Sequence, residues 1–85
     1  MAYTDVEVYE VWKKCNERCV YGSQKKVLLT EYGVTWEIDH ANPYGVDDLR
    51  NRLVACIKHN RQKGNKTRQE FERWLDANPW EKACG

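Results

Sequence analysis

Apolar residues recur at helical spacing near the start of the chain. The positions concerned are Val8, Val11, Trp12 and Cys15. Their separations of three and four residues place them on one side of a helix. Before them, Thr4 and Glu7 form a T-x-x-E capping box, in which each side chain can bond the backbone amide of the other residue. The pattern predicts an amphipathic helix over about 5–18 that ends before Gly22.

The next apolar segments predict strands. Residues 26–30 and 34–38 flank a Tyr-Gly turn, and the second segment alternates apolar with polar positions, which is typical of a half-buried strand. Two strands around a glycine turn predict a hairpin. The Asn-Pro-Tyr-Gly segment at 42–45 indicates a loop. After it, the apolar run 53–55 predicts a further short strand.

The last third of the chain is expected to be helical. A helix resumes near Ile57 and breaks at the Gly-Asn pair 64–65, and a second capping box, Thr67 with Glu70, predicts a terminal helix over 68–77. The following Asn-Pro dipeptide ends that helix, because a residue before proline is pushed out of the helical region. Large aromatic residues on these apolar stripes are expected in the core: Trp12, Trp36, Phe71 and Trp74.

Composition and charge indicate the size of the domain but do not by themselves decide its function. The 85 residues predict a single domain, 1–85, with a core near the lower limit for independent folding, so a further staple such as a metal is expected. The net charge is only +1, but eight Lys or Arg residues lie between Arg50 and Arg73, opposed by Glu70 and Glu72 alone. Such a basic segment suits phosphate binding, although a solvated helix face would look the same.

The sequence shows neither a secretory signal nor an apolar run long enough to cross a bilayer. We therefore expect an intracellular, cytoplasmic protein with no membrane partner. Because that compartment keeps thiols reduced, the four cysteines are expected to bind metal or stay free rather than form disulfides.

Two residue pairs have spacings that suit structural zinc. Cys15 and Cys19 lie four residues apart at the end of the first predicted helix, so both thiols are expected on one side. Cys56 and His59 lie three apart, a spacing that clasps tetrahedral zinc. The predicted ligands are therefore these four residues. Cys84 is left over, either as a replacement for His59 or as a frayed free thiol.

A second candidate site begins at Asp39 and His40, which end the strand-like run. Histidine can accept a proton from water at neutral pH, and a carboxylate suits magnesium or manganese, but an ordinary surface pair would look the same. If the strand ends here, both groups can face one cavity. Further polar residues follow in a fixed order: Asn51, Cys56-x-x-His59-Asn60 and Lys63-Gly64. Together, residues 34–66 resemble the HNH motif of the ββα-metal endonucleases.

The resemblance implies a role for each matching residue. His40 would be the general base, and Asp39 with Asn60 would hold one catalytic Mg²⁺ or Mn²⁺. Asn51 would pin the loop that follows His40, and Lys63 would contact phosphate. Basic side chains would bind the nucleic-acid backbone on either side without reading sequence; they are Arg50, Arg52, Arg61, Lys66 and Arg68.

The resemblance also implies the fold and the activity. The expected fold is α+β, a zinc-stapled ββα-metal core flanked by N- and C-terminal helices. The expected activity is metal-dependent DNA endonuclease action, nicking one strand with low sequence specificity, in a bacterium or phage. The protein would be a monomer or homodimer, alone or in a phage or restriction assembly. Two alternatives stay open: a non-catalytic, zinc-stabilised nucleic-acid-binding module, and a nuclease toxin domain released from a larger protein.

Three features depart from the common motif. Asn51 follows His40 by only eleven residues, and the loop between them holds the single glycine Gly45. His59 stands where most zinc-bearing members have cysteine. Cys15 and Cys19 are separated by three residues instead of two.

Overall fold

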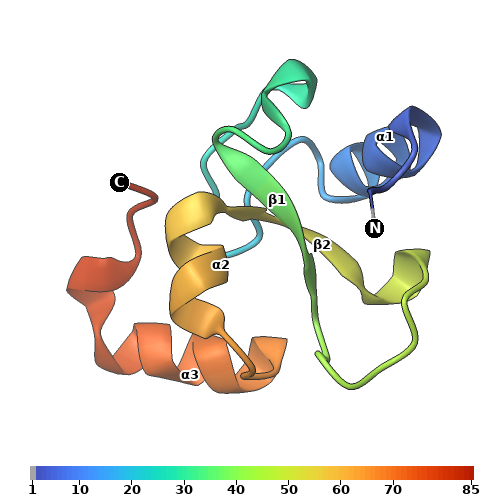
Figure 1. Cartoon of the computed structure of the whole chain (residues 1–85). Coiled ribbons are helices and arrows are strands. Elements are labelled where there is room, and N and C mark those ends of the chain that lie inside the picture. Colours follow the sequence, from blue (N-terminus) through green and yellow to red (C-terminus); the bar gives the residue numbers. More distant parts are fainter. Residues whose placement is uncertain (1) are drawn as a thin grey trace.

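A computed structural model describes residues 2–85 and contains two strands and three helices (Figure 1). The elements are α1 (Asp5–Lys14), β1 (Trp36–His40), β2 (Arg52–Cys56), α2 (Ile57–Lys63) and α3 (Arg68–Ala77), with 3-10 turns at Leu29–Glu31, Leu49–Asn51 and Pro79–Glu81. The expected α+β class is confirmed. Both predicted capping boxes are present, and α3 has the predicted bounds.

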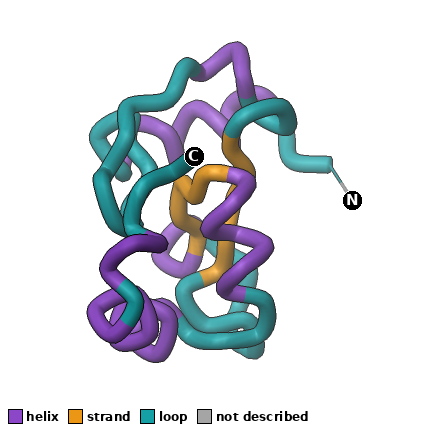
Figure 2. The backbone as a smooth tube through the Cα atoms, turned by 90° about the vertical axis from the view of Figure 1, so that its left-hand side faces the viewer, coloured by secondary structure: helices purple, strands orange, loops and turns teal. Residues whose placement is uncertain are grey.

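The two strands form one antiparallel pair, and β2 continues directly into α2. Trp36 lies opposite Cys56 at one end of the pair, and His40 lies opposite Arg52 at the other. Viewed from the side, the strands lie between helical segments of the chain (Figure 2). The strand pair therefore carries the start of α2 at one end and the loop after His40 at the other.

Residues of β2 contribute to two cores, which explains why its Leu-Val-Ala run is apolar throughout. Val54 packs with residues of α1 and with Trp36, whereas Leu53 and Ala55 pack with α3. The first core consists of Val8, Val11, Val27, Trp36 and Val54, and the second of Cys19, Tyr21, Leu53, Ala55, Cys56, Phe71 and Leu75. Among the predicted core aromatics, Trp36 and Phe71 are fully buried, and Trp12 and Trp74 pack at the edges.

Helix α1 is shorter than predicted. It ends at Lys14, and the following Asn16 and Glu17 both have positive φ, 56° and 63°. Non-glycine residues in this left-handed region cannot continue a helix. The chain therefore turns sharply before Cys19, and Cys15 and Cys19 do not share a helical face.

The strand predicted at 26–30 does not form. The carbonyl oxygen of Val27 accepts a hydrogen bond from Trp12 Nε1 at 3.0 Å, and that of Leu28 accepts one from Trp36 Nε1 at 2.8 Å. These indole donors take carbonyls that a strand partner would need, and a 3-10 turn follows at once. The predicted second strand, 34–38, lies at 36–40 instead and pairs with β2.

The segment after α3 is docked against the loop that follows α1. The amide of Ser23 donates to the carbonyl of Lys82 at 3.0 Å. A Cβ added at Gly22, where φ is +59°, would lie 1.9 Å from the same carbonyl oxygen. Only glycine allows this approach, and it carries Cys84 into the molecule. The alternative that Cys84 is a frayed thiol is therefore wrong.

We predict that Gly22→Ala destabilises the fold by about 2 to 4 kcal/mol, since a left-handed backbone and an overpacked contact both oppose a methyl group there. Gly33→Ala is the matched control, because its φ is +84° but nothing lies within 4 Å of an added Cβ. The control should lose about 1 kcal/mol, the backbone cost alone. Denaturant unfolding measures both, and equal losses would contradict the close contact at Lys82.

Candidate functional site

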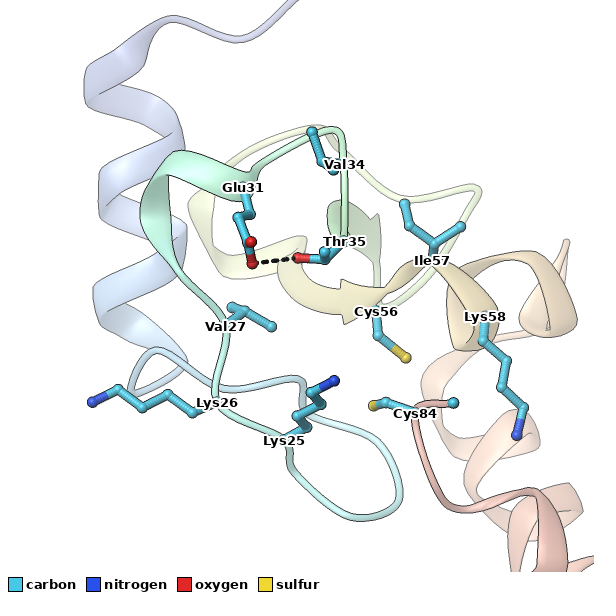
Figure 3. Close-up of a pocket in the computed structure, with 11 residues that line it drawn as sticks. Lys25, Lys26, Val27, Glu31, Val34, Thr35, Cys56, Ile57, Lys58 and Cys84 are labelled. Atoms are coloured by element: carbon cyan, nitrogen blue, oxygen red, sulfur yellow. Dashed lines mark hydrogen bonds between the residues drawn. The ribbon is translucent and has the colours of Figure 1, made fainter.

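Four side chains from separate parts of the chain converge on one point. Cys19 follows α1, Cys56 ends β2, His59 lies on α2 and Cys84 lies in the segment after α3. One ligand atom from each lies within 4.8 Å of the others. Figure 3 shows the sulfur atoms of Cys56 and Cys84 near one another. This Cys3His cluster can hold a metal ion such as zinc.

The distances from His59 to the three sulfur atoms suit tetrahedral zinc. His59 Nδ1 lies 3.8 Å from Cys19 Sγ, 3.3 Å from Cys56 Sγ and 3.7 Å from Cys84 Sγ. Zinc–sulfur and zinc–nitrogen bonds of ordinary length at tetrahedral angles require a separation of about 3.5 Å. His59 Nε2 lies 2.8 Å from the Glu81 carbonyl oxygen, so it can donate there and leave Nδ1 as the ligand atom.

The pKa values of the clustered thiols are shifted in opposite directions. A hydrogen bond with the Cys56 thiol lowers the pKa of Cys19, and the same contact raises the pKa of Cys56. Burial raises the pKa of Cys84. One thiolate is thus stabilised at the expense of the others, since adjacent negative charges repel each other in a buried site. A divalent cation would remove this repulsion and release the remaining protons.

Cys15 is not part of the cluster, which corrects the predicted ligand set. Its sulfur accepts a hydrogen bond from the amide of Val54 at 3.4 Å, whereas that of Cys19 accepts from the amide of Cys56 at the same distance. The left-handed turn at Asn16 separates the two thiols along β2. Cys84 takes the fourth position in place of Cys15, and His59 stays in the set.

A cavity of about 270 Å³ adjoins the Cys3His cluster (Figure 3). Cys56 and Cys84 line one side, and Lys25 and Lys58 bring positive charge to it. Lys58 Nζ donates to the carbonyl oxygen of Ala83 at 2.9 Å. That bond holds the segment next to Cys84 against α2.

His40 lies at the end of β1 with its imidazole held by a carboxylate. Its Nε2 lies 2.7 Å from Asp47 Oδ1, and Tyr3 donates its hydroxyl to the same oxygen at 2.9 Å. About one third of the His40 side chain, 33%, is exposed. Both hydrogen-bond contacts of the imidazole within residues 2–85 are made by Nε2, with Asp47 and with the Tyr3 hydroxyl at 3.3 Å. Nδ1 has no such contact and is not among the buried side-chain atoms without a partner, so it is open to water or a ligand.

Asp47 is a candidate site residue that the sequence did not single out. Arg52 Nε donates to its Oδ1 at 2.8 Å, and the Arg52 guanidinium lies 4.7 Å from the centre of the Tyr3 ring. The hydrogen bond from Arg52, followed by the one from His40, holds the pKa of Asp47 well below its ordinary value. An acid in a polar loop carries no periodic signal, so only the fold brings it to His40.

Asn51 braces the loop that follows His40. Its Oδ1 accepts from the amide of Asn42 at 2.9 Å, and its Nδ2 donates to the carbonyl of Asn42 at 2.9 Å. The amide of Ala41 donates to the Asn51 carbonyl at 2.9 Å. These bonds fix both residues after His40. The resemblance implies the same role for Asn51.

Asp39 does not share a cavity with His40, contrary to expectation. His40 is still part of β1, so its side chain and that of Asp39 point to opposite faces of the strand. Asp39 is buried, with Oδ2 accepting from Tyr21 at 2.7 Å and Oδ1 lying 3.1 Å from Lys63 Nζ. Burial, then the Asp39 charge, raises the pKa of Tyr21.

These contacts do not fit a catalytic cation at Asp39 and Asn60. The ammonium of Lys63 occupies the place beside Asp39 where a cation would bind, and it also donates to the His40 carbonyl at 2.7 Å. Asn60 lies on the same face of β1 but donates to Glu37 Oε1 at 2.9 Å. Lys63 is itself only 1% exposed, so the predicted phosphate contact at Lys63 is wrong.

The predicted nucleic-acid-binding residues separate into two groups. Arg50, Arg61 and Lys66 are exposed, and Arg68 is half-exposed. Arg52 is not available as predicted, because its side chain is only 11% exposed and is bonded to Asp47. The basic segment thus contributes both surface cations and internal ion pairs.

Comparison with protein-family models and with curated proteins finds no match to this chain. Among residues 2–85, no helix combines the length and the apolar composition that a bilayer crossing requires. The Cys3His cluster is therefore described by its geometry alone, as four residues that can hold a metal ion such as zinc, and the HNH resemblance stays a prediction from the motif.

We predict that Cys84→Ser lowers the zinc content from about one ion per chain to well below it, because three ligands hold zinc less tightly than four. Cys15→Ser is the matched control, and it should keep the full metal content. Metal analysis after dialysis of the purified variants measures both. Zinc loss in Cys15→Ser with retention in Cys84→Ser would restore the ligand set expected from the sequence.

Proposed function

We propose that this protein is a nuclease of the HNH type that hydrolyses DNA phosphodiester bonds, with His40 as the general base. The observation that carries the proposal is the double support of His40. Asp47 holds Nε2 of the imidazole, and Asn51 fixes the loop that follows it. A histidine held in this way, with its other nitrogen open, is oriented for proton transfer.

The chemistry follows from the position of the proton on the imidazole. With Nε2–H donating to Asp47, the lone pair is on Nδ1, which can accept a proton from water. The hydroxide formed would attack the phosphorus, and the bond from phosphorus to the leaving 3′ oxygen would break. That oxygen would keep the electron pair of the bond and take up a proton from water. The Asp47 carboxylate would stabilise the resulting imidazolium, because the two groups lie 2.7 Å apart.

The arrangement of elements supports the same proposal. β1, β2 and α2 follow one another, as in a ββα unit, and two metal ligands lie where β2 passes into α2. A metal there would support the strand pair that carries His40 at its far end. One such site acts on one strand, so the expected product is a nick.

The contacts of Asp39 and Asn60 do not fit the catalytic Mg²⁺ or Mn²⁺ that the resemblance implies there. The structure places Lys63 against Asp39, so no step of the mechanism is assigned to that cation. The same contact favours the second candidate function, a non-catalytic, metal-stapled module that binds nucleic acid. In that case the Asp39–Lys63 pair would only stabilise the core.

We predict that the purified protein converts supercoiled plasmid to nicked circles, and that His40→Ala slows this reaction by about 10²- to 10⁴-fold, the usual contribution of a general base. Gel electrophoresis measures the products with magnesium, with manganese and without added divalent cation. Cleavage that requires either cation would show that a divalent cation takes part in the reaction, without assigning it to Asp39. Intact plasmid under all three conditions would favour the binding module.

We predict that Asp47→Asn lowers kcat, by less than His40→Ala, and leaves KM nearly unchanged, because it disturbs the imidazole and not the contact with DNA. Asp48→Asn is the matched control, since Asp48 bonds Arg50 rather than His40. Nitrogen chemical shifts of His40 provide an independent measurement, and Asp47→Asn should reduce the share of the tautomer protonated at Nε2. Equal effects of the two substitutions would rule out a positioning role for Asp47.

A further inference from the structure

A second cavity, of about 350 Å³, lies between the end of α1, the turn after it and the first residues of β2 and α3. Four cations line it: Lys14, Arg18, Arg50 and Arg68. No described residue that lines it is acidic. Two of these cations are paired with carboxylates that do not line the cavity, Arg50 with Asp48 at 2.9 Å and Arg68 with Glu72 at 3.4 Å. Within residues 2–85, Lys14 and Arg18 therefore carry the unbalanced positive charge of the cavity, which attracts ions of the opposite sign.

Two of the four cations have only neutral partners within residues 2–85. The Lys14 ammonium donates to the carbonyl oxygens of Leu49 and Arg52, and Arg18 donates to the carbonyl oxygen of Gln24 at 3.5 Å. Burial lowers the pKa of Lys14, so its positive charge is held there at a cost. An anion in the cavity would offset that cost.

The other two cations connect the cavity with the loop after His40. Arg50 also lines a shallow cavity that is bordered by Asn42, Asn51 and its ion-pair partner Asp48. The amide of Arg68 donates to the carbonyl oxygen of Ala41, the residue after His40, at 2.6 Å. An extended polyanion bound in the cavity could therefore continue towards the loop after His40.

We propose that this cavity binds a phosphate group of the nucleic-acid backbone. The inference rests on the proposed function for the identity of the polyanion, and it assigns binding roles to Lys14 and Arg18, which lie outside the basic segment 50–73. Arginine suits this task because its planar guanidinium can donate two parallel hydrogen bonds to phosphate oxygens. Lys14 would add a point charge.

The test is the salt dependence of binding to a labelled DNA duplex, measured by fluorescence anisotropy without added magnesium or manganese. Loss of one phosphate contact lowers the slope of log affinity against log salt by about 1. Arg18→Gln and the exposed Arg50→Gln should each show that change and a several-fold weaker affinity. Arg73→Gln is the matched control, because Arg73 is exposed on α3 and does not line the cavity.

Cys15 supplies a second measurement, since it lines the cavity and lies outside the metal cluster. Bound DNA should slow the alkylation of Cys15 in the metal-loaded protein. The proposal is overturned if Arg18→Gln and Arg50→Gln behave like Arg73→Gln, if the native protein does not bind the duplex, or if saturating DNA leaves the alkylation rate unchanged.

The outcome for this cavity is separable from that for the nuclease. Binding that depends on Arg18, together with plasmid that stays intact in every metal, would retain the cavity and reject the catalytic proposal. Cleavage that depends on His40, together with binding that is indifferent to Arg18 and Arg50, would do the reverse.

Discussion

The convergence of three thiols and one imidazole is the constraint on which the rest of the structure depends. Its ligands come from the turn after α1, the end of β2, α2 and the segment after α3. A chain of 85 residues has a core near the lower size limit for independent folding, so a ligand set that joins four such segments contributes a large share of what holds them together. A metal bound there would join both cores. Cys19 and Cys56 belong to the second core, and β2, which Cys56 ends, also supplies Val54 to the first core.

Local patterns predicted the helices well but the long-range pairings poorly. Capping boxes gave the starts of α1 and α3, since these contacts join residues three apart. The sequence indicated a hairpin between neighbouring segments, yet residues 36–40 pair with β2, because the Trp12 and Trp36 side chains bond the backbone at 27–28. Apolar alternation identifies a strand, but it does not identify the partner of that strand.

The candidate site was predictable to a similar extent. Cys56 and His59 were found from their local spacing, whereas Cys84 is brought to them by the close approach at Gly22. The motif directed attention to His40 and Asn51, but no motif indicated Asp47. Positive charge along 50–73 was visible in the sequence. Burial of Arg52 and Lys63 was not, because burial depends on where Asp47 and Asp39 lie in space.

The alternation of β1 gives two adjacent residues different biological constraints. Asp39 is bonded in the interior with Lys63 and Tyr21, whereas His40 reaches the half-exposed face beside Asp47. The two positions should therefore tolerate substitution to different extents during evolution. Position 39 would resist change in every descendant that still folds, including one that has lost activity. Position 40 would be free to vary as soon as selection for activity is relaxed. A substitution there would therefore be the first sign that a related protein has lost activity but kept the fold.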